Sequence, residues 1–153
     1  MALLGITLDE YRALAEFRRT LRRFLAFSAQ AARVGGVEPQ QHQLLLALQG
    51  LPARVEATIG ALAGHLEIRH HSAVELVDRM EARGLVRRAR RAKDLRQVLV
   101  QLTPRGRGLL LRLTLAHRAE LRSVGPALVR TLGEVLRPPA LVRHAGSRHA
   151  RGR

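Results

Sequence analysis

Residues 85–102 interrupt an otherwise helical pattern, and this stretch constrains the fold more than any other. Residues 85–87 pass from apolar to basic, residues 97–102 (QVLVQL) largely alternate between polar and apolar, and the segment between them is polar. A period of two residues is typical of a strand with one buried face. We therefore expect two short strands, 85–87 and 97–102, paired as a β-hairpin.

The predicted hairpin carries a concentrated positive charge. Within residues 87–96 there are six basic side chains and one acidic side chain, Asp94. The basic residues are Arg87, Arg88, Arg90, Arg91, Lys93 and Arg96. A narrow basic finger suits the minor groove of DNA, where negative potential is concentrated, although a run of charge is also typical of a solvated surface.

Helical periodicity precedes the hairpin. It predicts a first helix over about 9–33, which ends at Gly35-Gly36, and a second over 40–49. A third helix is predicted from an N-cap at Thr58 to about residue 66, and a fourth follows it and ends at a C-cap at Gly84. The last two are short and joined tightly near Glu67, which is a helix-turn-helix pattern. A hairpin placed directly after such a pair is the wing of a winged helix.

The residues after the hairpin predict two further helices. Thr103 is placed to cap the first, Pro104 opens it, and it extends to about Leu121; the second follows Gly125-Pro126 and ends near Leu136. These helices and the one over 9–33 have apolar stripes with no partner layer within the chain. We therefore expect a homodimer in which a second copy covers them.

The charge balance limits the possible partners. Of 153 residues, 27 are Lys or Arg and 12 are Asp or Glu, a formal net charge of +15. Such a balance indicates nucleic acid or an anionic membrane surface as partner, and an acidic small substrate less strongly. The chain has no cysteine, which excludes disulfides and thiol redox chemistry, and no run of 18 apolar residues. We expect a soluble, cytoplasmic protein without membrane contact.

The second helix of the predicted pair has an outward face that can read DNA. Residues 70, 71, 74, 75 and 78 lie opposite the apolar stripe of Ala73, Leu76, Val77 and Met80, so His70, His71, Val74 and Glu75 can meet base edges. Glu75 can accept a hydrogen bond from cytosine or form a surface salt bridge with Arg79. Ser72 can contact a phosphate or cap the helix, and the cap is favoured. Arg79 and Arg83 can face phosphates or merely solvate the helix end.

Catalytic and metal sites find little support in the sequence. His70 and His71 are adjacent, so on a helix they point about 100° apart, and no spaced ligand completes a metal site. Ser72 lacks a nucleophile elbow or oxyanion-hole sequence, and Gly106 and Gly108 do not form a phosphate loop. We expect neither an enzyme nor a bound cofactor.

An ordered set of short motifs resembles the MarR family of bacterial transcription regulators. The set comprises Leu62-Ala63, LVDRMEARGLV at 76–86, Asp94-x-Arg96 in the hairpin, and Leu102-Thr103-x-x-Gly106, and the resemblance covers roughly residues 38–110. It implies a mainly α fold with a small β-hairpin wing: a winged helix-turn-helix domain with long N- and C-terminal dimerisation helices. It also implies a homodimer that binds a pseudo-palindromic operator in double-stranded DNA, usually as a repressor.

The resemblance suggests how the chain is divided. Residues 1–36 would form the N-terminal dimerisation helix, 37–102 the DNA-binding region, 103–137 the C-terminal dimerisation helices, and 138–153 a flexible basic tail. In the wing, Asp94 and Arg96 share a face, so the acid can hold the arginine in one pose, or the two form an exposed pair of little energetic weight. The departures are Glu67, where members often have Gly, His70-His71 before Ser72, and Glu75, where a basic residue is frequent.

Many members of the family respond to a small molecule bound between the dimerisation and DNA-binding regions. If this chain has such a cleft, the candidates for its wall are Phe17, Leu21, Phe24 and His42, with Arg18 or Arg22 available for an acidic group; core packing is the alternative for the apolar ones. The alternative to a sequence-specific regulator is a non-specific basic protein that coats DNA. A role at a membrane surface is a third possibility.

Overall fold

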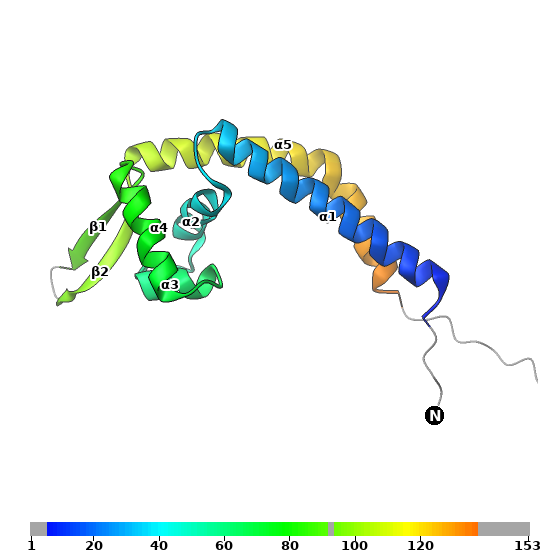
Figure 1. Ribbon diagram of the computed structural model, residues 1–153, viewed down its shortest axis with the longest axis horizontal. Helices are drawn as coiled ribbons and strands as arrows, with labels where there is room; N and C mark the ends of the chain where they lie inside the picture. Colours follow the sequence, from blue (N-terminus) through cyan, green and yellow to red (C-terminus); the bar gives the residue numbers. More distant parts are fainter. Residues whose placement is uncertain (1–5, 92–93, 138–153) are drawn as a thin grey trace, which may run out of the picture.

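A compact unit carries a long two-helix arm. The computed structural model describes residues 6–91 and 94–137, with the backbone alone for residue 91 and residues 94–97. The order of elements is α1 (Leu8–Val34), α2 (Pro39–Gly50), α3 (Ile59–His65), α4 (His70–Ala82), β1 (Val86–Arg91), β2 (Asp94–Leu102) and α5 (Pro104–Val135). Helices α1 and α5 run side by side in opposite directions to form the arm, and the remaining elements form the compact unit (Figure 1). The mainly α fold with one antiparallel hairpin is therefore confirmed.

The helix ends follow the local signals in the sequence. The side chain of Thr58 accepts a hydrogen bond from the Ala61 N–H (3.1 Å), and that of Thr103 accepts one from the Gly106 N–H (3.0 Å). Both bonds satisfy N–H groups that have no partner within the helix. Helix α1 ends at Gly35-Gly36, and Gly84, with φ of +66°, follows α4 in the left-handed conformation that glycine adopts without strain.

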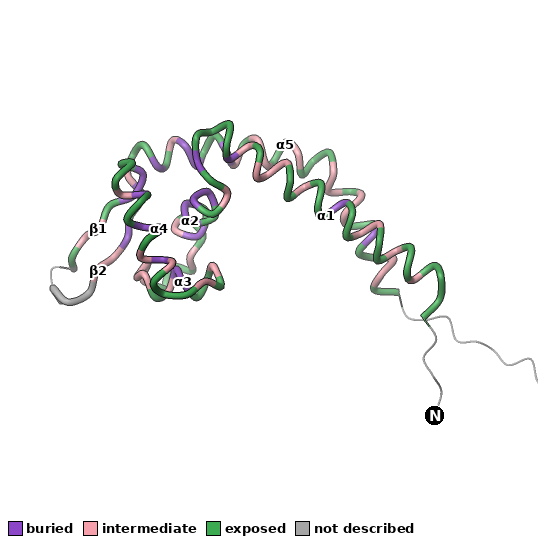
Figure 2. Tube along the Cα trace, in the orientation of Figure 1, coloured by how far each residue is buried: buried purple, intermediate pink, exposed green. Residues whose placement is uncertain are grey.

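The core lies in the compact unit. Its fully buried side chains include Leu44 and Leu45 of α2, Leu62 of α3, Leu76 and Met80 of α4, and Val86 and Val100 of the hairpin, all of which belong to one cluster. Removing such a side chain costs about 2–5 kcal/mol, so this cluster holds the helix pair and the hairpin together. Figure 2 shows most of the buried positions in this unit, whereas the arm is largely exposed or half-buried.

The hairpin is longer than the alternating pattern predicts. The predicted strands 85–87 and 97–102 extend in the structure to Val86–Arg91 and Asp94–Leu102. The register runs from Val86 opposite Leu102 to Arg90 opposite Val98, and it shifts before Arg91 pairs with Asp94. Backbone pairing with the apolar end of β2 is enough to keep the basic residues extended, even though their sequence VRRARR has no alternation of its own.

The predicted break at Gly125-Pro126 is wrong, because α5 continues through Pro126 as one helix. Proline removes one hydrogen bond, to the carbonyl four residues earlier, and that residue, Arg122, is exposed to water. Proline also restricts the residue before it, partly through that residue's Cβ, which Gly125 lacks. Packing against α1 spans the same region, since Thr20 lines one pocket together with Val124 and Ala127.

The basic tail predicted over 138–153 lies outside the described residues. None of the helices within the described ranges is long and apolar enough to cross a membrane.

Gly106 is required where the first turn of α5 meets the end of the compact unit. A Cβ at this position would lie 2.0 Å from the carbonyl oxygen of Leu85, so the two segments are in direct backbone contact. Gly106→Ala should lower the free energy of unfolding by at least about 2 kcal/mol, because the backbones must separate.

Gly108→Ala is the matched control. Its Cβ would meet only the mobile end of the Arg112 side chain, at 3.9 Å. It should stabilise the protein by about 0.5–1 kcal/mol through helix propensity. Chemical denaturation measures both, and equal stabilities would contradict the close approach.

Candidate nucleic-acid interface

Helix α4 has one buried apolar face and one exposed face, as expected of a DNA-recognition helix. Ala73, Leu76, Val77 and Met80 are buried against the core, whereas His70, His71 and Glu75 are exposed on the opposite side and Val74 is half-buried. The periodicity therefore correctly identified which side chains leave the core, and the outward ones are free to meet another molecule.

Ser72 does not cap α4, so the predicted cap is wrong. The helix begins at His70, its N-cap is Arg69, and no side chain caps it. Ser72 is therefore the third helical residue and is half-buried. The tight turn before the helix decides this start, because the Ile68 N–H donates to the Ala63 carbonyl (3.0 Å) and the helix begins three residues earlier than a cap at Ser72 requires.

The turn between α3 and α4 contains Glu67 in a left-handed conformation. Its φ is +54°, and it is the one non-glycine residue with positive φ in the described ranges. A side chain in this region costs about 1–2 kcal/mol, which explains why glycine is the residue expected here. The chain keeps the turn geometry and accepts strained backbone at this position.

Glu75 and Arg79 lie close enough for a weak ion pair. The carboxylate and the guanidinium are 3.9 Å apart, one turn of α4 from each other, and both side chains are more than half exposed. Such a pair contributes less than about 1 kcal/mol, so it does not prevent Glu75 from turning toward a base edge.

The base of the hairpin is clamped to α4 by Arg88. Its guanidinium contacts Asp78 and Glu81, each at 2.6 Å, and its backbone N–H donates to Glu81 at 2.8 Å. The Arg88 side chain is 26% exposed, so these bonds are partly shielded from water. The sequence interpretation assigned Arg88 to DNA and missed this clamp, for which the only local signal is two carboxylates three residues apart on a helix that leads into a basic strand.

The clamp shifts the protonation of both partners. The backbone hydrogen bond from Arg88, followed by the side-chain bond, lowers the pKa of Glu81. Burial lowers the pKa of Arg88, but its bonds to Glu81 and Asp78 outweigh that effect, so the pKa is raised overall. Both shifts favour the charged pair.

The other basic residues of the hairpin differ in how they are held. Arg87 donates to Gln101 across the hairpin (3.0 and 3.2 Å). Arg90 is exposed, and none of the described residues forms a hydrogen bond or ion pair with it. The side chains of Arg91, Lys93, Asp94 and Arg96, all predicted to contact DNA, lie outside what the structure describes.

A second set of contacts holds the hairpin to the entry of α3. The Val100 N–H donates to the Ala57 carbonyl (2.8 Å), and Thr58 forms an isolated antiparallel bridge with Leu99. The hairpin is thus tied to α4 through β1 and to the start of α3 through β2. The far ends of the paired strands and the N-terminal end of α4 lie on the same side of the compact unit, away from the arm (Figure 1).

Arg83 has partners other than the solvent or a phosphate. Its guanidinium donates to Gln41 (2.9 Å) and to the Gly36 carbonyl, which ties the end of α4 to the first turn of α2 and to the loop before it. These partners are 42 and 47 residues away in the sequence, so no local pattern indicates them.

The residues proposed for a ligand cleft are only partly brought together. Phe24 and the buried His42 both meet His117 of α5, with ring centroids 6.2 and 4.6 Å apart. Phe17 is half-buried, and Arg18 and Leu21 lie on the exposed side of α1. Burial, followed by the neighbouring His117, lowers the pKa of His42, which favours the neutral ring.

His117 is the residue of this junction that the sequence interpretation missed. Its Nδ1 lies 2.6 Å from the Leu113 carbonyl, which can only accept, so Nδ1 carries a proton. Its Nε2 lies 2.7 Å from the hydroxyl of Ser28 on α1. The histidine therefore links α1 to α5 and packs on α2, at the point where the arm meets the compact unit.

Comparison with known proteins identifies the fold. Residues 35–97 match the sequence profile of the MarR family. AbsC, a MarR family transcriptional regulator from Streptomyces coelicolor, is 20% identical, with a TM-score of 0.68 over 88% of this chain and 93% of AbsC. No protein in the curated set matches.

Two other similar structures contain bound molecules. The transcriptional repressor CouR bound to a 23-mer DNA duplex is 26% identical, with a TM-score of 0.60 over 78% of this chain and 89% of CouR. CouR from Rhodococcus jostii RHA1 bound to p-coumaroyl-CoA gives 22% identity and a TM-score of 0.59 over 77% and 87% of the two chains.

The clamp gives a pH-dependent prediction. Because the folded-state pKa of Glu81 is lowered, its stabilising contribution is complete above the unfolded pKa and is lost as the pH falls through the folded value. Wild type should therefore lose stability between about pH 5 and pH 3 more steeply than Glu81→Gln. At pH 7 the variant should be less stable by about 1 kcal/mol, a modest value because the carboxylate is partly exposed.

Glu75→Gln is the control for this measurement, since Glu75 is on the same helix and approaches only Arg79. It should change stability by less than about 0.5 kcal/mol. Parallel pH profiles for wild type and Glu81→Gln, from denaturant unfolding at each pH, would show that the clamp carries no stability.

Proposed function

We propose that the chain belongs to the MarR family and is a homodimeric, sequence-specific transcription regulator that acts as a repressor at a pseudo-palindromic operator. The observation that carries the proposal is that two elements able to enter a groove of DNA lie on one side of the compact unit: the exposed face of α4 and the basic hairpin (Figure 1). An α-helix fits the major groove and a basic finger fits the adjacent minor groove.

The proposed roles follow from burial and pairing. The residues proposed to read base edges are His70, His71, Val74 and Glu75. Ser72 and Arg79 lie beside them on α4 and are proposed to contact the phosphate backbone of the DNA. Arg90 is exposed and unpaired within the described part, so it is available for a phosphate. Arg88 instead holds the hairpin to α4, because two carboxylates already occupy its guanidinium. The roles at the tip rest on the sequence alone: Arg91 and Lys93 contact phosphates, and Arg96, held in position by Asp94, enters the minor groove.

The arm supports a dimer. Leucines stay exposed along both helices, among them Leu14 (46%) and Leu25 (54%) on α1 and Leu115 (54%) and Leu132 (41%) on α5. Burying one such side chain contributes about 1.5–3 kcal/mol, and a second copy with the same stripes is the simplest partner. Two-fold symmetry would place two α4 helices about 34 Å apart on one face of DNA.

A small-molecule effector is proposed at the junction of arm and compact unit. There Phe24 and His42 surround His117, and the three come from α1, α2 and α5. The binding of p-coumaroyl-CoA by CouR, a protein of similar fold, is consistent with such regulation.

Selection of bound duplexes from a random pool tests the function and its symmetry. We expect a palindromic motif whose half-site centres are about 10 base pairs apart, because each α4 reads one half-site. Recovery of unrelated sequences, with affinity that depends only on salt and duplex length, would instead indicate the DNA-coating alternative.

Two substitutions separate base reading from phosphate contact. On the selected site His71→Ala should cost about 1–3 kcal/mol of binding free energy, with little effect on random duplex. Arg90→Ala should weaken both duplexes equally and reduce the salt slope by about 1.

The control is Arg12→Ala, at the far end of the arm, where the side chain is exposed beside Asp9. It should leave both affinities unchanged. If His71→Ala weakened random and selected duplexes to the same extent, α4 would not be the reading helix.

A further inference from the structure

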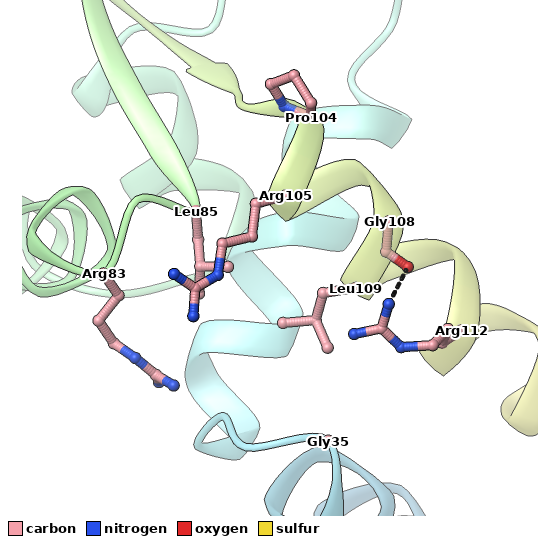
Figure 3. A pocket seen from close by; sticks show the side chains of 8 residues that line it. All are labelled: Gly35, Arg83, Leu85, Pro104, Arg105, Gly108, Leu109 and Arg112. Atoms are coloured by element: carbon pink, nitrogen blue, oxygen red, sulfur yellow. Dashed lines mark hydrogen bonds between the residues drawn. The ribbon is translucent and has the colours of Figure 1, made fainter.

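A polar pocket lies where the arm joins the compact unit. It has a volume of about 340 Å³ and is lined by the end of α1, the corner between α4 and β1, and the first turns of α5. Three of its lining residues are Arg83, Arg105 and Arg112, and no acidic residue is among them. Figure 3 shows Arg83 and Arg105 reaching toward each other on one side of Leu109, with Arg112 on the other side.

The three guanidinium groups keep most of their donors free. Arg83 uses two bonds, to Gln41 and to Gly36, and these hold it in place. Arg112 makes one long bond, 3.3 Å, to the Gly108 carbonyl. Arg105 has no hydrogen bond or ion pair to any residue that the structure describes. Since a guanidinium has five N–H donors, the pocket offers many donors that only water or a ligand can satisfy.

Several other arginines among the described residues are paired with carboxylates. Arg88 has two carboxylate partners, Arg19 pairs with Glu16, and Arg130 pairs with Glu134. In the pocket, three positive charges share one concave space without a lining carboxylate. Like charges held together repel, and an anion that enters the pocket removes the repulsion while gaining charge-assisted hydrogen bonds.

DNA on the proposed reading face is not the expected source of this anion. Arg83 follows the C-terminal end of α4, whereas His70 and His71 are at its N-terminal end. Thirteen helical residues separate the two ends, and at about 1.5 Å per residue they span roughly 20 Å. The pocket therefore lies near the arm, at the opposite end of α4 from His70 and His71.

We propose that this pocket binds a small phosphate-bearing ligand, a phosphate monoester or diphosphate. Guanidinium groups bind phosphate oxygens through paired N–H donors, and three of them match more than one negative charge. The volume is within the range of small-molecule sites. This site is separate from the junction around His117 and goes beyond DNA recognition.

Calorimetric titration of the full chain with sodium pyrophosphate, at constant ionic strength, tests the site. Wild type should bind one equivalent per chain in a saturable way. Arg105→Gln/Arg112→Gln should bind about 100-fold more weakly, about 10-fold for each lost charge-assisted contact. Both arginines are exposed, so the variant should fold, and its circular dichroism and melting curve confirm that it does.

Arg12→Gln removes one positive charge from an exposed position at the far end of the arm and should bind pyrophosphate within about 2-fold of wild type. Absence of saturable binding by wild type, or equal binding by the double variant, overturns the proposal.

A second measurement, of DNA binding, distinguishes a free phosphate ligand from the phosphates of the DNA backbone. Without pyrophosphate, the double variant should bind random duplex with the affinity and salt slope of wild type. A salt slope reduced by about 2 would assign the two arginines to DNA phosphates and overturn the small-ligand site. Both pyrophosphate outcomes are independent of whether a palindromic operator exists, so failure of one proposal is distinguishable from failure of the other.

Discussion

The direct backbone contact between Gly106 and Leu85 determines how the two parts of the molecule are joined. At this corner the Thr103 hydroxyl donates to the Gly84 carbonyl (2.7 Å) and accepts from the Gly106 N–H (3.0 Å), while the Thr103 N–H donates to the Leu85 carbonyl (3.1 Å). One threonine therefore caps α5 and closes the base of the hairpin. Because α5 starts against Leu85, which follows α4, the direction of the arm is coupled to the orientation of α4.

The basic hairpin is held at its base from two directions. Arg88 binds two carboxylates of α4, and the Val100 N–H binds the carbonyl that precedes Thr58. A flexible basic loop would bring charge to DNA with little geometric selectivity, whereas a hairpin fixed to α4 keeps its paired strands at a defined position relative to the exposed face of that helix. This rigid coupling favours a sequence-specific regulator over a protein that coats DNA.

The junction between arm and compact unit concentrates the long-range polar contacts. Arg83 ties α4 to the loop after α1, and His117 ties α5 to Ser28 of α1 while packing on His42 of α2. Two chemically different candidate sites lie here, an aromatic one around His117 and a cationic one around Arg105. A ligand at either site would contact segments from both parts, so its binding would favour one arrangement of the arm and the compact unit over others.

The sequence by itself determined those features whose cause is local. The caps at Thr58 and Thr103, the helix ends at Gly35-Gly36 and Gly84, the outward face of α4 and the hairpin after it all follow from propensity and periodicity within a few residues.

Tertiary structure decided what depends on distant partners. Packing with α1 carries α5 through Pro126, the turn at Ile68 starts α4 before Ser72, and pairing with β2 extends β1. The carboxylates of α4 convert Arg88 from a candidate DNA contact into a clamp, and folding brings His117 to Ser28, 89 residues away. A side chain's partners depend on which surfaces the core brings together, and that is a property of the packed chain, not of any short segment.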